Sequence, residues 1–210
     1  MSHSGNFEKI VYDANPILYY CFNHREKLRG NIVHFRVIGF TNKSINCTQH
    51  FINNNATIET IKQVISEICK KGVAKIVDEY CNDGQTKDLI GISRSSKIPQ
   101  AMKLRLVKKT EDKIKDLIKK SWFSVIDYSP NSDDIERIRK FYKSLEPTPK
   151  MITHMNGKNR NVPWPSDVDM MLLAYSKEND APILTNDTDF TNFKDELQSE
   201  ALCFEIIELN

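Results

Sequence analysis

The sequence predicts an α/β fold in which a mainly parallel sheet is flanked by helices. Short apolar runs rich in β-branched residues alternate along the chain with longer segments that have the apolar period of a helix. This alternation is typical of β-α-β units, whose strands are parallel. The composition fits such a fold, since 40% of the 210 residues are hydrophobic and 28% are charged, as in ordinary globular proteins.

The first half of the chain opens with a predicted strand. Residues 9–13 (KIVYD) are a short apolar run that ends in an acid before Asn-Pro, so a buried strand meets a turn there. A helix then begins at Ile17. Residues 24–31 are polar and are expected to form a loop, whereas residues 31–40 fit either a strand or part of a helical insertion. The other elements expected in this half are a helix at 41–51, a strand at 57–61 and one or two helices between Lys62 and Tyr80.

The second half continues the alternation. Residues 84–100 are polar and are expected to form a loop. The segment 122–128 (WFSVIDY) is a good strand, and Asn131 can cap the helix after it. The proline-rich stretch 147–165 is expected to be irregular. The remaining elements expected are helices at 102–120, 135–145 and 166–178, the last of them capped by Ser166, and strands at 182–185 and 204–209.

Charge is distributed unevenly along the chain, although the net charge is only +2. Residues 97–120 hold nine Lys or Arg against three acids, and residues 166–210 hold eleven acids against two lysines. Basic and acidic regions of this kind suit a nuclease, in which cations hold phosphates and carboxylates hold metal ions. A solvated charged helix explains the basic run equally well.

Cysteines and hydropathy exclude several other classes. The five cysteines are scattered and form no CxxC pair, so they are expected to be reduced, and a zinc site is not expected. No apolar run approaches the length of a membrane helix, and the polar start is no signal peptide. The sequence therefore predicts a cytoplasmic protein without a membrane partner.

Acidic residues follow two of the predicted strands. Asp13 ends the first strand, and Asp187 and Asp189 follow the strand at 182–185 together with Thr185 and Asn186. Binding sites of open α/β sheets lie outside the carboxyl ends of the strands. Such a group of hard oxygen ligands suits Mg²⁺ or Mn²⁺. Either segment is also explained if the acids only cap the helices that follow them.

A third acidic segment opens the helix at 166–178. Asp167 and Asp169 fall in its first turn, where the helix dipole favours carboxylates whatever their function. Residues 170–174 are apolar almost all round, so this helix is expected to pack tightly against the sheet. Its N-terminal end is then held at the edge where the strands end.

The order and spacing of these segments resemble those of the PIN-domain family of metal-dependent nucleases. The matching segments are VYDANPILYY, DVDMMLLAYS and APILTNDTDF. The resemblance implies a three-layer α/β/α sandwich over residues 8–210, with a flexible tail at 1–7. It also implies helical insertions at about 24–55 and 82–120, which lengthen the chain relative to short family members. The family's remaining acid lies on the helix after the second strand, and Glu67 fits that place best, with Glu59 and Glu79 as alternatives.

The resemblance also implies roles for individual residues. Carboxylates that share one edge of the sheet need cations to offset their repulsion, and two such ions can activate a water and stabilise a leaving oxygen. The expected catalytic and metal-binding residues are Asp13, Glu67, Asp169 and Asp187, with Asp189 as a further metal ligand. Asn15, Thr185 and Asn186 are expected to orient these carboxylates or a water.

A nucleic acid has two predicted contact regions. Lys158, Arg160 and Trp164 precede the third acidic segment and could hold phosphates and stack a base. Trp164 fits a core position between two prolines slightly better than a stacking position. The basic helix at 103–120 is the second candidate, and its apolar residues could instead pack on the domain.

These features together predict a Mg²⁺- or Mn²⁺-dependent endoribonuclease. The alternatives are a structure-specific DNA nuclease, which would use the same carboxylates, and a PIN-like module that binds nucleic acid or protein without cleaving it. A phosphatase or receiver domain is disfavoured because Asn15 stands where a second acid is needed. A homodimer and an inhibitory protein partner are both compatible with the sequence.

Overall fold

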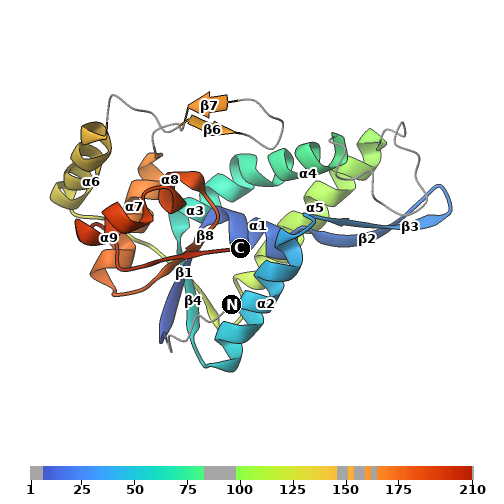
Figure 1. The fold of residues 1–210 in the computed structure, drawn as a ribbon. Coiled ribbons are helices and arrows are strands. Elements are labelled where there is room, and N and C mark those ends of the chain that lie inside the picture. Colours follow the sequence, from blue (N-terminus) through green and yellow to red (C-terminus); the bar gives the residue numbers. More distant parts are fainter. Residues whose placement is uncertain (1–6, 83–97, 146–150, 154–158, 162–164, 210) are drawn as a thin grey trace.

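Five parallel strands form a central sheet in the order β5-β4-β1-β8-β9 (Figure 1). The structure is a computed structural model that describes residues 7–82, 98–145, 151–153, 159–161 and 165–209. The α/β class and the parallel sheet predicted from the sequence are confirmed. The strands are β1 (Lys9–Tyr12), β4 (Thr57–Ile61), β5 (Phe123–Ile126), β8 (Ile183–Thr185) and β9 (Ile206–Glu208).

Strand β1 lies at the centre of the sheet. Ile10, Val11 and Tyr12 are almost completely buried, as expected for a strand covered on both faces. Val11 is paired with Glu59 of β4 on one side and with Ile183 of β8 on the other. Chain segments from the beginning and the end of the sequence therefore lie side by side at the middle of the sheet.

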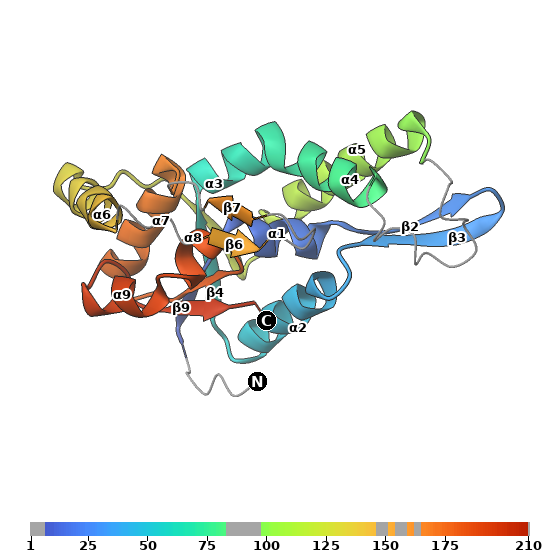
Figure 2. The ribbon, with the colours of Figure 1, turned by 45° about the horizontal axis from the view of Figure 1, so that its top comes forward.

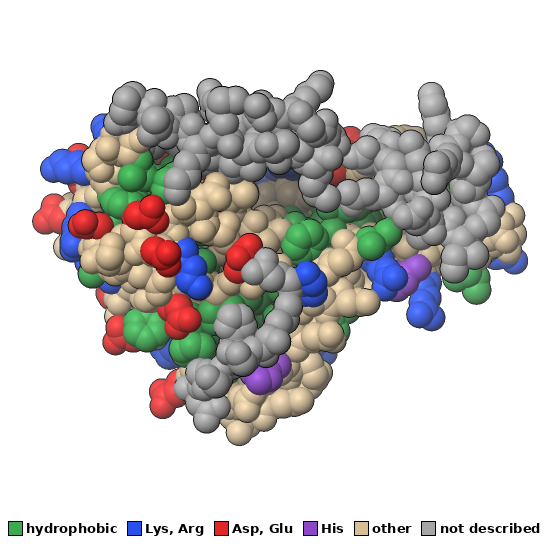
Figure 3. Space-filling view, viewed as in Figure 1, with side chains coloured by type: hydrophobic (Ala, Val, Ile, Leu, Met, Phe, Trp, Pro, Cys, Tyr) green, Lys and Arg blue, Asp and Glu red, His purple; other side chains and the backbone are tan. Residues whose placement is uncertain are grey.

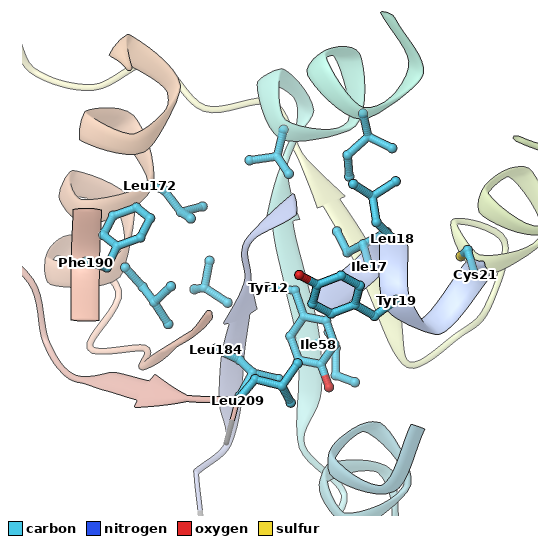
Figure 4. Packing of buried hydrophobic residues seen from close by; sticks show 14 of the residues in the cluster. Tyr12, Ile17, Leu18, Tyr19, Cys21, Ile58, Leu172, Leu184, Phe190 and Leu209 are labelled. Carbon is cyan, nitrogen blue, oxygen red and sulfur yellow. The ribbon is translucent and has the colours of Figure 1, made fainter. Parts of the chain in front are cut away.

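Helices cover both faces of the sheet, an arrangement compatible with a three-layer sandwich (Figure 1). Figure 4 shows Leu172 and Phe190 packing on one side of β1, and Ile17 and Leu18 packing on the other. One face is covered by α1 (Ala14–Cys21), α2 (Phe40–Asn53) and α5 (Gln100–Leu117), and the other by α7 (Asp167–Glu178) and α9 (Lys194–Ser199), with α6 (Ser132–Ser144) packed against α7.

A nearly continuous helical segment follows β4 at one end of the sheet. It consists of α3 (Lys62–Glu67), the π-helical turn η1 (Ile68–Gly72) and α4 (Val73–Asn82). Gly72 lets this segment approach α1 closely, since a Cβ atom at this position would lie 3.2 Å from Cδ1 of Leu18. The short helix α8 (Thr188–Thr191) lies at the same end of the sheet, directly after β8.

Residues 24–28 of the polar segment 24–31 belong to a β-strand, so the prediction of a loop there is wrong. A β-hairpin is built from β2 (Asn23–Leu28) and β3 (Asn31–Arg36), and the insertion at 24–55 therefore holds a hairpin as well as helix α2. The connecting residues Arg29 and Gly30 both have positive φ, at 49° and 86°, as a two-residue type I′ turn requires. Polar residues at inward-facing positions of β2 had hidden the strand pattern.

Three further differences from the sequence prediction concern small segments. The stretch 147–165, expected to be irregular, contains a short antiparallel pair, β6 (Met151–Thr153) and β7 (Asn159–Asn161). Phe7, assigned to the flexible tail, packs against the core, while residues 1–6 lie outside the described part. Within the described ranges, none of the helices has the length and apolar character needed to cross a membrane.

Helix α5 offers a matched pair of leucines that tests its packing. Leu106 is fully buried, whereas Leu104 on the same helix is 61% exposed. Leu106→Ala is expected to lower the free energy of unfolding by about 2–5 kcal/mol because it leaves a cavity. Leu104→Ala is expected to change it by less than about 0.5 kcal/mol. Urea denaturation measures both, and equal effects would contradict this orientation of α5.

Candidate functional site

The strand order reverses between β1 and β8. From β1 the chain builds β4 and β5 on one side, and it then crosses back to place β8 and β9 on the other. The carboxyl ends of two strands whose connections run in opposite directions leave a crevice, where ligands of open α/β proteins bind. Asp13 directly follows β1, and Asn186 and Asp187 directly follow β8. The acidic strand ends noted in the sequence therefore meet at this point of the sheet.

A cleft of about 400 Å³ opens at this end of the sheet. It lies between α1, the α3–η1–α4 segment and the N-terminal ends of α7 and α8, whose arrangement can be followed in Figure 2. Its walls contain six carboxylates from four separate segments and two lysines on the side of η1 and α4. The acids are Asp13, Glu67, Glu79, Asp169, Asp187 and Asp189, and the lysines are Lys71 and Lys75.

Asp13 is buried at the base of the cleft with only 5% of its surface exposed. It caps α1, since its Oδ1 accepts a hydrogen bond from the backbone N–H of Ala14 at 2.5 Å. Its Oδ2 accepts a hydrogen bond of 2.7 Å from the hydroxyl of Thr185. Burial raises the pKa of Asp13 to about 8, and the nearby carboxylates of Asp169 and Asp187 contribute to the rise. Within the described ranges, no Lys or Arg forms an ion pair with Asp13.

Asp169 is fixed by a capping box at the start of α7. Its backbone N–H donates to Oγ of Ser166 at 3.2 Å, and its own Oδ2 accepts from the backbone N–H of Ser166 at 2.7 Å. Burial raises the pKa of Asp169 to about 6, and the charges of Asp187 and Glu67 add to this effect against the hydrogen bonds from Ser166. Asp167, two residues earlier, is exposed, pairs with Arg139 at 3.5 Å and does not line the cleft.

Asp187 caps the short helix α8, so the capping role considered from the sequence is present together with a place in the cleft. Its Oδ1 accepts from the backbone N–H of Asp189 at 2.9 Å, and its own N–H donates to Oγ1 of Thr185 at 2.9 Å. Thr185 therefore connects the carboxylate of Asp13 with the backbone of Asp187. Asp189 is 8% exposed, and its carbonyl accepts a hydrogen bond from the hydroxyl of Tyr142.

Asn15, which was expected to orient a carboxylate or a water, lines the cleft. Asn186, expected to act in the same way, lies behind the cleft wall. Its Nδ2 donates to the hydroxyl of Tyr19, a residue of that wall, at 3.0 Å. Its Oδ1 is buried and accepts no hydrogen bond from any residue that the structure describes.

Three glutamates are candidates for the fourth acid that the resemblance to PIN domains implies. Glu67 ends α3, lies exposed at the cleft and contributes to the raised pKa of Asp169. Glu79 of α4 lines the cleft as well and lies 4.0 Å from Lys75. Glu59 lies elsewhere, in β4, where it is 6% exposed and accepts a hydrogen bond of 2.7 Å from Tyr175. Glu67 and Glu79 therefore lie where a further metal ligand is expected, whereas Glu59 does not.

Lys71 and Lys75 are cleft residues that the sequence analysis did not single out. Glu67, Lys71, Lys75 and Glu79 recur every four residues, a spacing that places side chains on one face of a helix. Over three such steps an α-helix rotates the side chains away from a common direction. The wider turn of η1 opposes this rotation and keeps all four residues at the cleft. The spacing was readable in the sequence, but the π-helical turn was not.

The cleft fits a divalent cation in ligand type and in charge. Carboxylate oxygens are the ligands that Mg²⁺ and Mn²⁺ prefer, and a cation would offset the repulsion that raises the pKa of Asp13. Among the residues described, no three His, Cys, Asp or Glu side chains form a ready-made metal site. Side-chain rotation is therefore needed to bring three carboxylates onto one ion.

The predicted nucleic-acid contacts are only partly described. Lys158 and Trp164 lie outside the described residues, and of Arg160 only the backbone, in β7, is described. The comparison with models of known families, with curated proteins and with solved structures finds no match. The resemblance to PIN domains therefore rests on the motifs of this chain alone.

The raised pKa of Asp13 predicts that the metal-free protein loses stability as the pH rises. The ordinary pKa of this side chain is 3.8, and the folded value is about 8, so between these values the folded state keeps a proton that the unfolded chain has lost. The free energy of unfolding therefore falls through this window and levels off above it. The raised pKa of Asp169 lowers the free energy of unfolding in the same way as the pH rises to about 6.

In EDTA, thermal denaturation followed by circular dichroism is expected to give a melting temperature that falls from about pH 5 to about pH 8. Asp13→Asn keeps a side chain of the same shape and removes the titrating group, so its melting temperature is expected to depend less on pH. The same pH dependence in both proteins would show that Asp13 is ionised in the folded state.

Proposed function

We propose that this protein is a Mg²⁺- or Mn²⁺-dependent endoribonuclease of the PIN type. The observation that carries the proposal is the meeting of Asp13, Asp169 and Asp187 at one cleft, although Asp13 and Asp187 are far apart in the sequence. The electrostatic influence of Asp169 and Asp187 on Asp13 supports their closeness. The cleft also lies where the strand order reverses, which is the usual binding site of an open α/β sheet.

The three aspartates and Glu67 would hold the cations, with Asp189 as a further ligand. Bound cations would supply an activated water and stabilise the charge on the leaving oxygen of a phosphodiester. The chain itself orients the carboxylates, because Ala14 and Thr185 hold Asp13 by two hydrogen bonds and the capping box holds Asp169. These hydrogen bonds restrict the starting positions of Asp13 and Asp169, and rotation of carboxylate side chains would complete the site when the cations bind.

The two lysines of the cleft suit the substrate. Lys71 and Lys75 line the cleft from η1 and α4, between Glu67 and Glu79, where they can contact a phosphate of the nucleic acid. A phosphodiester that approaches six carboxylates meets repulsion, and cations in the same cleft reduce it.

A module that binds nucleic acid without cleaving it is the second candidate. The observation that favours it is the lack of a ready-made group of three ligands among the described residues. A DNA nuclease would use the same carboxylates, and the cleavage assay described next distinguishes RNA from DNA as the substrate.

Cleavage of labelled RNA and DNA in Mg²⁺, Mn²⁺ or EDTA tests the proposal. Cutting of RNA within the chain is expected with either metal and not with EDTA. Asp13→Asn and Asp187→Asn are expected to lower the rate roughly a hundredfold or more, since a bound ion supplies several kcal/mol of transition-state stabilisation. Asp167→Asn is the matched control, because Asp167 carries the same charge near the cleft without lining it, and its rate is expected to stay within about twofold of wild type.

Equal activity of all the variants would trace the cleavage to a contaminating nuclease. Binding of RNA without cleavage under any condition would support the binding module.

Glutamine substitutions decide which glutamate completes the site. Glu67→Gln is expected to weaken Mn²⁺ binding and cleavage about 10–100-fold, because Glu67 lies close enough to raise the pKa of Asp169. Glu79→Gln is expected to have a smaller effect, and Glu59→Gln none on activity. Isothermal titration with Mn²⁺, together with the cleavage assay, measures all three. A loss of activity confined to Glu79→Gln would assign the role to α4 in place of α3.

A further inference from the structure

The outer face of the β2–β3 hairpin is basic. Alternation along the two strands turns one set of side chains toward the core and the other toward solvent. The buried inner set consists of His24, Glu26, Leu28, Val33 and Phe35, and the outer set consists of Asn23, Arg25, Lys27, Ile32, His34 and Arg36. We call the outer set the hairpin face. It contains three Arg or Lys residues and no acid.

The hairpin is a rigid part of the fold. Its two strands are paired over their whole length and are joined by a turn of two residues. Its inner side is attached to α5, since Nε2 of His24 lies 2.8 Å from Oγ1 of Thr110, and Glu26 forms ion pairs with Arg105 and Lys109. The hairpin therefore projects from the sheet as a fixed ribbon (Figure 2).

Cations of α5 extend the positive charge along the hairpin. Arg105 and Lys109 lie beside β2 with about half of their side chains exposed, and Lys113 donates a hydrogen bond to the carbonyl of Asn23. Glu26, the only acid in residues 23–36, is buried between the hairpin and these cations. On the side seen in Figure 3, the exposed charged side chains around the hairpin are mainly Lys and Arg.

The pKa of His34 supports a positive potential at the hairpin face. It is lowered first by burial and then by the charges of Arg36, Arg25 and Lys113. Like charges on neighbouring strands destabilise a hairpin. Because the hairpin face keeps its cations together and holds no acid of its own, this surface suits an anionic partner.

We propose that the hairpin face, through Arg25, Lys27 and Arg36, binds the phosphate backbone of the RNA that enters the cleft, an inference that rests on the proposed nuclease function for its choice of ligand. Cations that recur along an extended, rigid ribbon match a polymer with regularly spaced negative charge. Two-stranded ribbons of this shape also fit against nucleic acids. An acidic protein surface would present irregular charge and would be expected to require exposed apolar contacts, of which the hairpin face has one, Ile32.

The hairpin also adjoins the cleft. Helix α1 carries Asp13 at its start and Tyr19 in the cleft wall, and it runs directly into β2. At this junction the ring of Phe22 lies 6.2 Å from the ring of Tyr80, another residue of the cleft wall. The start of the hairpin therefore lies next to one end of the cleft.

Charge removal with a matched control tests this inference. The test variant is Arg25→Gln/Lys27→Gln/Arg36→Gln, and the control variant is Lys140→Gln/Lys143→Gln/Lys194→Gln, which removes the same charge from positions on α6 and α9. Binding of a short fluorescent single-stranded RNA is measured by anisotropy in EDTA over a range of salt concentrations. The test variant is expected to bind roughly tenfold or more weakly, with a salt slope shallower by about 2, since each lost phosphate contact removes about 0.7. The control variant is expected to bind as the wild type does, and melting curves verify that both variants fold.

Three results would overturn the inference: unchanged RNA binding by the test variant, an equal loss in the control variant, or no RNA binding by the wild type. Displacement of the RNA by a polyglutamate peptide at equal charge concentration would assign the hairpin face to an acidic protein and would also overturn it. The cleavage assay keeps the two proposals apart. If the test variant binds RNA more weakly but the wild type does not cleave RNA with metal, only the nuclease proposal is rejected. If the wild type cleaves RNA with metal but the test variant binds RNA as tightly as the wild type, only the hairpin proposal is rejected.

Discussion

The parallel pairing of β1 with β8 brings Asp13 and Asp187 to the same end of the sheet. It places Val11 opposite Ile183, and the hydrogen bond from Thr185 to Asp13 then closes the same junction at its carboxyl end. Asp13 and Asp187 cap α1 and α8, and Asp169 completes the capping box of α7 with Ser166. Each carboxylate is therefore held by the start of its own helix, and capping and a place in the cleft are compatible properties of the same side chains.

This arrangement concentrates negative charge that the protein alone does not neutralise. Asp13 is buried beside Asp169 and Asp187, and burial and repulsion together raise its pKa to about 8. A divalent cation would remove this unfavourable interaction, and it would do so at the place where the sheet topology leaves a crevice. Lys71, Lys75 and the basic hairpin would then give the proposed polyanionic substrate a favourable approach to an acidic cleft.

The sequence predicts the sheet well because its strands are apolar and buried. It fails at β2, where the inward positions are occupied by His24 and Glu26 in place of apolar residues. Their partners, Thr110 and Lys109, lie more than 80 positions away, and no local pattern shows that contact. The four aspartates that line the cleft were accessible to sequence analysis because they follow strands or begin helices, although their catalytic role stays a prediction. Lys71 and Lys75 were missed because their place depends on the π-helical turn η1.

The central claim is that Asp13, Asp169 and Asp187 share a cation. A crystal structure of the wild-type protein grown with Mn²⁺, with an anomalous difference map at the manganese absorption edge, tests this claim most directly. The account predicts a manganese peak in the cleft, bonded to an oxygen of Asp13 and to at least one of the other two carboxylates. Manganese bound only outside the cleft, or a cleft without a peak at saturating Mn²⁺, would contradict it.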